Sequence, residues 1–281
     1  MLESPLLVRF WGVRGSLPSP SPSTAVYGGN TPCVEMRCGE RLLVFDAGSG
    51  IAFLGRALVK DPPRRIDIFL SHCHYDHIEG LPFFIPLQRA GYQAHVWSGH
   101  LHGRLSTAEM VGGYMREPYF PINPSIFSAT MCYNDLAPGD TIDAGDGISI
   151  DTMMLDHPGG AVAYRVNYAG HSVVYLTDVE HKPGRIDEAI VAFVRDSDIF
   201  IYDGMFCDDE FQTYRGWGHS TWQQGARLAD AASVGEYVVF HHAPDRTDAE
   251  LAEVELKLKH LRSDSRLARE GMSLVPRQRA G

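Results

Sequence analysis

A run of candidate metal ligands dominates the chemistry of this sequence. The segment from His72 to His77 reads His-Cys-His-Tyr-Asp-His. On an extended turn, His72 and His74 can face one ion while Asp76 and His77 turn toward a second. Zinc accepts imidazole and carboxylate ligands together. The run therefore predicts a site for two divalent metal ions rather than a cluster of core histidines.

The cysteines do not indicate a site of their own. The five cysteines include no C-x-x-C pair, so they describe neither a disulfide framework nor a zinc knuckle. Cys73 lies between His72 and His74, but neighbouring side chains of an extended segment point to opposite sides. We therefore expect Cys73 to face the core.

Other candidate ligands also follow apolar, strand-like segments. Residues 66–70 precede the histidine run, and residues 148–154 precede His157. Asp178 follows residues 172–176, and His241 and His242 follow residues 237–240. Metal ligands need a rigid support, and the ends of strands provide one. We therefore interpret these residues as further ligands.

The elements that would position them alternate along the chain. Further strands are predicted at 6–13, 34–37, 42–45, 163–168 and 199–202, and helices at 51–58, 222–232 and 248–262. This order predicts one α/β domain over residues 1–281, with helices outside the sheets. Residues 101–138 show the least regular pattern and are predicted to form a lid or rim. The last helix carries an apolar stripe, expected to pack on the body or, alternatively, to form a homodimer seam: Leu251, Val254, Leu258 and Leu261.

Composition limits the class of partner. The formal net charge of −10 argues against a general nucleic-acid coat, which needs a basic face. Residues 1–10 lack the apolar run of a signal peptide, and no stretch of about 18 apolar residues occurs. These features predict a cytoplasmic protein without a membrane partner.

In these motifs the chain resembles the metallo-β-lactamase-fold hydrolases, over roughly residues 8–248. The shared segments include Phe-Asp-Ala-Gly-Ser-Gly around Asp46, Asp-His-Pro-Gly-Gly around His157 and Tyr-Leu-Thr-Asp ending at Asp178. The resemblance implies a four-layer αββα sandwich with the site at one edge of two facing sheets. It assigns His72, His74 and His157 to one metal, Asp76, His77 and His242 to the second, and Asp178 to a bridge. Asp46 would brace the ligand loops. His241 competes with His242, and the motif His-Ala-Pro-Asp-Arg selects His242.

Several residues point to a branch of this superfamily. The flavo-diiron oxidoreductases carry Glu where this chain has His74, which favours hydrolysis over redox chemistry. Gly-His-Ser-Thr at His219 resembles the extra catalytic histidine of the phosphodiesterase branch, which includes ribonuclease Z, class II cyclic-nucleotide phosphodiesterases and phosphoribosyl cyclic phosphate phosphodiesterases. Asp203 occupies the position of the acid that orients this histidine. No segment resembles a long tRNA-clamping arm, so RNA is not the expected partner.

The predicted function is hydrolysis of a phosphodiester in a small cyclic phosphate, such as a cyclic nucleotide. The alternatives are an RNA 3′-processing endonuclease of the ribonuclease Z type and a lactone or thioester hydrolase. Asp76 would orient the attacking water or take its proton, and His219 would protonate the leaving oxygen. The expected cofactor is a pair of zinc ions, with manganese or iron as alternatives. Arg14, Tyr164 and Arg165 are candidates to contact a phosphate, with pairing to a local acid as the alternative for Arg14. Glu180 and His181 are either substrate contacts or solvated loop residues.

Overall fold

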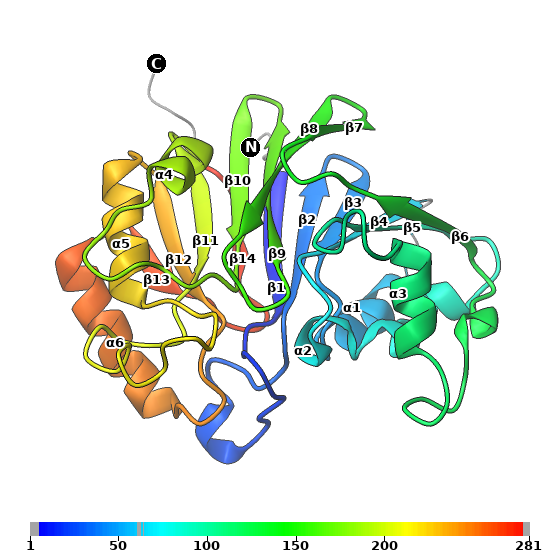
Figure 1. Ribbon diagram of the computed structural model, residues 1–281, viewed down its shortest axis with the longest axis horizontal. Helices are drawn as coiled ribbons and strands as arrows, with labels where there is room; N and C mark the ends of the chain where they lie inside the picture. The colour runs from blue at the N-terminus through cyan, green and yellow to red at the C-terminus, as the bar shows by residue number, and fades with distance from the viewer. Residues whose placement is uncertain (1–5, 61–62, 64, 278–281) are drawn as a thin grey trace.

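Two facing β-sheets run through the centre of the structure, a computed structural model that describes residues 6–60, 63 and 65–277 (Figure 1). The ends of the domain predicted for 1–281, including half of the 1–10 segment, lie outside these residues. The first sheet has the order β14-β1-β2-β3-β4-β5-β6. Its strands are β1 (Leu6–Gly12), β2 (Cys33–Cys38), β3 (Arg41–Phe45), β4 (Arg65–Leu70), β5 (Gln93–Ser98), β6 (Thr130–Asp135) and β14 (Ser273–Leu274).

The second sheet has the order β13-β12-β11-β10-β9-β8-β7. Its strands are β7 (Thr141–Gly145), β8 (Ile148–Leu155), β9 (Ala161–Tyr168), β10 (His171–Leu176), β11 (Ile199–Asp203), β12 (Glu236–Phe240) and β13 (Ser265–Leu267). Side chains from the inner faces of both sheets, among them Phe10, Phe45, Tyr164 and Phe240, form one buried core. Apolar side chains on both faces of each sheet explain why these strands read as nearly continuous apolar runs.

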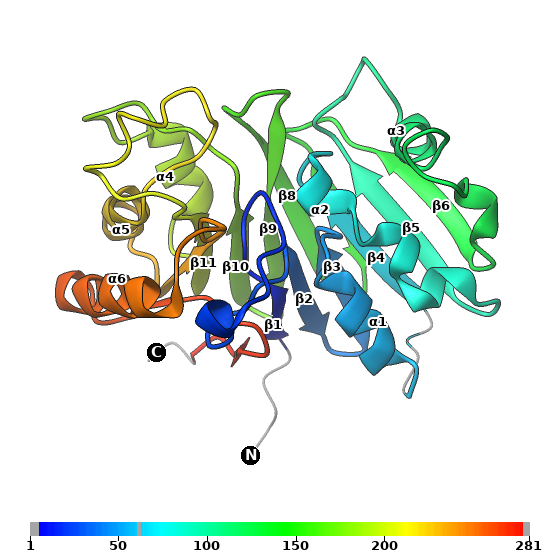
Figure 2. The ribbon, with the colours of Figure 1, turned by 90° about the horizontal axis from the view of Figure 1, so that it is seen from below.

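Helices cover the outer face of each sheet (Figures 1 and 2). On the first sheet lie α1 (Ile51–Leu58), α2 (Tyr75–Ile78) and α3 (Thr107–Tyr114). On the second lie α4 (Glu188–Val194), α5 (Trp222–Ala231) and α6 (Asp248–Leu261). The four layers confirm the predicted αββα sandwich. Among the residues described, no helix combines the length and the apolar composition needed to cross a membrane.

The predicted stripe on the last helix packs mainly within the molecule. Leu251, Val254 and Leu258 are buried against the second sheet and α5, whereas Leu261 is 57% exposed. A capping box at Thr247 and Glu250 begins the helix. Three of the four residues of the stripe therefore pack on the body of the protein, which is the first of the two predicted roles.

The segment predicted as a lid or rim contains regular structure. Residues 101–138 include α3, the short 3₁₀ turn Pro124–Ile126 and β6, which pairs in parallel with β5. Tyr114 at the end of α3 donates a hydrogen bond to the Glu79 carbonyl, next to α2. β6 was not predicted from the sequence, because its residues are partly exposed and show no clear apolar alternation.

Strand direction explains how the ligand-bearing segments meet. β10, β11 and β12 are mutually parallel, and so are β3, β4 and β5. Carboxyl ends of parallel strands lie at one edge of a sheet. Asp178, Asp203 and His241 therefore gather at one edge of the second sheet, opposite the histidine run that follows β4.

Candidate metal centre

The histidine run changes from extended to helical backbone in its middle. His74 is extended, with φ −62° and ψ 150°, and directly precedes α2, which carries Asp76 and His77. The change directs the four side chains into two sets, as expected from the sequence. One possible ligand set is His72, His74 and His157; another is Asp76, His77 and His241.

The first set consists of three neutral imidazoles. Burial lowers the pKa of His72, His74 and His157. Nε2 of His157 lies 3.1 Å from Nδ1 of His74, and the buried Nε2 of His72 has no hydrogen-bond partner. Nδ1 of His157 donates to the Gly218 carbonyl at 2.8 Å, so its Nε2 offers a lone pair to the centre of the set.

In the second set, ring nitrogens and a carboxylate oxygen face one another at close range. His77 Nδ1 donates to Asp46 at 2.7 Å, which leaves its Nε2 facing Asp76 Oδ2 at 3.2 Å and His241 Nε2 at 3.2 Å. Burial opposes a charge on His77, but Asp76, Asp178 and Asp46 raise its pKa well above the usual value. The negative charge of these carboxylates, which favours a proton on His77, would also attract a metal ion.

Asp178 lies between the two sets. Its Oδ1 is 3.9 Å from Nε2 of both His72 and His157, and its Oδ2 is 3.3 Å from His77 Nε2 and 3.5 Å from His241 Nε2. One carboxylate oxygen thus faces each set, which is the arrangement that a bridging ligand requires.

The donor chemistry fits two divalent cations. Three ring nitrogens converge within 4.8 Å in the first set, and two ring nitrogens and a carboxylate oxygen do so in the second. Borderline-soft ions such as zinc accept both kinds of ligand. Among the described residues, the ion pairs of Asp76, Asp178 and Asp203 involve only histidines, never Lys or Arg. The buried carboxylates therefore lack the permanent positive charge that two metal ions would provide.

The structure corrects one predicted ligand. His241, not His242, joins Asp76 and His77, with its Nε2 3.3 Å from Asp76 Oδ2. His242 is fully buried and donates from Nε2 to the Ala268 carbonyl at 2.9 Å. The cause is the backbone, because His241 takes a left-handed conformation with φ 61° and sends the two rings to different sides.

His219 and Asp203 form a buried pair beside these sets. His219 Nδ1 donates to Asp203 Oδ2 at 2.9 Å, and Asp203 Oδ1 accepts the Met205 N–H at 3.0 Å. Burial lowers the pKa of His219, but Asp203, Asp178 and Asp76 together raise it to about 9. The Nδ1 also lies 3.7 Å from Asp178 Oδ1, so the pair borders the bridging carboxylate.

Comparison with known proteins agrees with this geometry. Residues 41–242 match the beta-lactamase superfamily domain. The chain belongs to this superfamily. It is accordingly an enzyme, a metal-dependent hydrolase with the metallo-β-lactamase fold. It is 24% identical to ribonuclease Z of Thermoplasma acidophilum, with 88% of this chain and 89% of the relative aligned.

Solved structures share the whole fold. The metallo-β-lactamase-fold protein YhfI from Bacillus subtilis superposes with a TM-score of 0.70 at 19% identity, covering 96% of this chain and 99% of that one. A diphosphatase from the PhnP family superposes with a TM-score of 0.66 at 18% identity, covering 96% and 97%. These structural similarities show that the whole chain has the metallo-β-lactamase fold.

Asp46 braces this metallo-β-lactamase centre from behind. Its Oδ2 accepts hydrogen bonds from His77 Nδ1 at 2.7 Å, Tyr175 Oη at 2.7 Å and Ser71 Oγ at 2.8 Å, and its Oδ1 accepts the Ser71 N–H. A carboxylate that holds the far nitrogen of a ligand histidine fixes its tautomer and orientation. This is the bracing role expected for Asp46.

Sequence reasoning missed the contribution of Gly15 and Ser16. The Ser16 N–H donates to Asp76 Oδ2 at 2.8 Å, from a residue with φ 61°. A Cβ on Gly15 would lie 2.5 Å from two ring atoms of His241, so only glycine allows the loop to approach this closely. Nothing in the type or spacing of these two residues indicated contact with the ligands.

Three residues predicted to contact phosphate serve the fold instead. The buried Arg14 guanidinium donates to the carbonyls of Gly28, Ala243 and Arg246. Tyr164 donates to the Leu70 carbonyl at the end of β4. Arg165 donates to backbone carbonyls at the end of α4, those of Phe193 and Arg195. These side chains thus donate to backbone carbonyls, whose positions in the fold cannot be read from the sequence.

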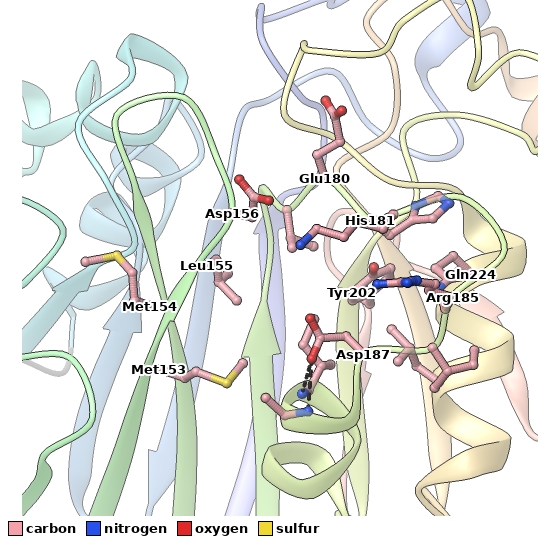
Figure 3. A pocket seen from close by; sticks show the side chains of 16 residues that line it. Met153, Met154, Leu155, Asp156, Glu180, His181, Arg185, Asp187, Tyr202 and Gln224 are labelled. Atoms are coloured by element: carbon pink, nitrogen blue, oxygen red, sulfur yellow. Dashed lines mark hydrogen bonds between the residues drawn. The ribbon is translucent and has the colours of Figure 1, made fainter.

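A cavity of about 350 Å³ lies beside the ligand sets without including them (Figure 3). Asp156 and Glu180 lie at one end of it, and Met153 and Asp187 lie farther along. His181 also lines it, stacked on Phe211 and hydrogen-bonded through Nδ1 to Ser220 Oγ at 2.7 Å. His181 therefore contacts the segment that carries His219 rather than the ligand sets.

Proposed function

We propose that this enzyme hydrolyses phosphodiesters, and that its substrate is a small cyclic phosphate such as a cyclic nucleotide. The observation that carries the proposal is the His219–Asp203 pair beside two sets of metal ligands. A thioester hydrolase has little use for such an acid, because a thiolate is a better leaving group than a ribose alkoxide.

The metal ions would be held by His72, His74 and His157 on one side and by Asp76, His77 and His241 on the other, with Asp178 between them. Two such ions lower the pKa of water toward about 7 and offset the negative charge of phosphate oxygens. Zinc suits the imidazole-rich sets, with manganese and iron as alternatives.

The protein's own groups would move the protons. Asp76, held by the Ser16 N–H, orients the attacking water and accepts its proton. The water oxygen forms a bond to phosphorus while the bond from phosphorus to the ribose oxygen breaks. His219, with Nδ1 bound to Asp203, donates a proton from Nε2 to that departing oxygen. The product is a phosphomonoester with a free hydroxyl group.

Two exposed aromatic side chains support a nucleotide substrate. Tyr75, between His74 and Asp76, is 68% exposed, and Trp217, shortly before His219, is 63% exposed. Their neighbours Tyr114 and Tyr214 back the two rings. Exposed aromatic faces stack nucleobases irrespective of sequence. Either ring is a candidate to bind the base of a cyclic nucleotide.

RNA 3′-end processing is the second candidate function, favoured by the match to ribonuclease Z over most of both chains. The net charge of −10 opposes it, since RNA binding draws on positive charge. A turnover panel on zinc- and manganese-loaded protein separates the candidates. It contains 3′,5′- and 2′,3′-cyclic nucleotides, ribose cyclic phosphate, precursor tRNA, a lactone and a thioester. Turnover of the cyclic phosphates is expected; cleavage of the tRNA alone, or of the lactone or thioester alone, would refute the proposal.

A further inference from the structure

The loop before His219 is fastened by one carboxylate. Oε2 of Glu180 accepts hydrogen bonds from the N–H groups of Gly216 at 2.7 Å and Gly218 at 3.0 Å. Hydrogen bonds to a charged acceptor are about twice as strong as neutral ones. Glu180 itself follows the bridging residue Asp178 closely in the chain, so the loop is tied to a segment that already belongs to the metal centre.

The same loop also holds a ligand of the first set. The Gly218 carbonyl accepts the Nδ1–H of His157 at 2.8 Å. The fit is close, because Gly218 has φ 85° and a Cβ there would lie 2.3 Å from His157 Nδ1. The Glu180 N–H donates to the Asp156 carbonyl at 2.8 Å, which ties Glu180 to the residue before His157 as well.

We infer that Glu180 is a positioning residue that couples a metal ligand to the acid histidine through the loop 216–218. Its carboxylate holds the loop, the loop's Gly218 carbonyl fixes the His157 ring, and the next residue, His219, faces Asp203. Figure 3 shows Glu180 beside Asp156, at the end of the cavity away from Asp187. Sequence reasoning left Glu180 as a substrate contact or a solvated residue.

Loss of this carboxylate should have two separable effects. A loop no longer held at Gly216 and Gly218 relaxes away from His157, whose Nδ1 then loses its fixed acceptor. Removing the partner that orients a ligand histidine typically weakens metal binding about 10- to 100-fold. His219 would also lose its alignment, and this second effect rests on the proposed role of His219 as the acid.

The test compares Glu180→Ala and Glu180→Gln with Glu253→Ala, an exposed control on the outer face of α6. Metal titration should show that one of two ions binds about 10- to 100-fold more weakly to Glu180→Ala. Glu180→Gln should recover part of that loss, because both N–H groups bind one oxygen that Gln retains. The control should bind like the parent protein.

Activity is measured with two aryl phosphodiesters, one with a p-nitrophenolate and one with a phenolate leaving group. Glu180→Ala should lose more kcat on the phenyl ester, whose leaving group needs protonation more. Unchanged affinity for both ions in Glu180→Ala would overturn the inference, whatever the substrate proves to be. Weakened metal binding with equal losses on both esters would keep the link to His157 and refute the link to His219. A parent enzyme inactive on every diester would refute the proposed function, while the metal titration would still decide the inference.

Discussion

Replacing His241 and His242 with alanine, one at a time, separates a metal ligand from a structural histidine. His241 Nε2 lies 3.2 Å from His77 Nε2 and 3.3 Å from Asp76 Oδ2, whereas His242 Nε2 donates to the Ala268 carbonyl. Burial lowers the pKa of His242 to about 3, so this ring is neutral at neutral pH. The two variants should therefore fail in different ways.

His242→Ala should destabilise the protein without releasing metal. It leaves a buried carbonyl without its partner, which costs about 1–3 kcal/mol, and opens a cavity besides. At roughly 2–4 °C per kcal/mol for a domain near this size, the lost hydrogen bond alone should lower Tm by about 2–12 °C, and the cavity should lower it further. The fall should be similar for metal-free and metal-loaded protein, and two ions should remain bound.

His241→Ala should instead weaken one metal site. At a metal concentration about 100 times the dissociation constant, an ion stabilises the fold by about 2.7 kcal/mol, and this variant should forfeit most of that gain. Metal analysis and thermal melts with and without zinc measure both effects. Retention of both ions by His241→Ala, together with loss of one by His242→Ala, would refute the assignment of His241.

Three further predictions concern His219, Asp203 and Trp217. His219→Ala should lose about 10²- to 10⁴-fold in kcat on a cyclic nucleotide but much less on bis(p-nitrophenyl) phosphate, with metal content unchanged; equal losses would show that His219 positions substrate instead. Asp203→Asn removes a charge that raises the pKa of His219, so the alkaline limb of the kcat–pH profile, where the acid deprotonates, should move to lower pH; a limb that stays in place would exclude His219 as its source. Trp217→Ala should raise KM for a cyclic nucleotide by about 5- to 150-fold, the equivalent of 1–3 kcal/mol of stacking, and leave KM for ribose cyclic phosphate unchanged; a parallel rise for both would mean that Trp217 does not bind the base.

The sequence alone determined the elements with strong local signals. The helix predicted at 51–58 is α1, and those at 222–232 and 248–262 are α5 and α6 to within a residue. Buried strands such as β4, β10 and β12 were also predicted, because apolar runs between turn signals identify strands covered on both faces. β5, β6, β7 and α4 were not predicted, since their half-exposed or short segments carry weaker patterns.

The histidine run, with Asp178 and the pair of Asp203 and His219, could likewise be predicted as a candidate site. The histidine run and Asp178 follow strand ends, and parallel strands bring such ends to one edge. Asp203 and His219 were predicted from the resemblance to the phosphodiesterase branch. The choice between His241 and His242 could not be made this way. It depends on a left-handed backbone at His241 and on the contact with Gly15, a residue more than 200 positions earlier in the chain.

The supporting contacts were decided only by the tertiary structure. Ser16 holds Asp76, and Glu180 holds the loop before His219, through backbone N–H groups that every residue except proline possesses. Arg14 carries a charge that suggested phosphate, yet backbone carbonyls from two distant segments take up its donors. Residue type and spacing reveal side-chain chemistry, but they cannot show which backbone groups the fold brings within hydrogen-bonding distance.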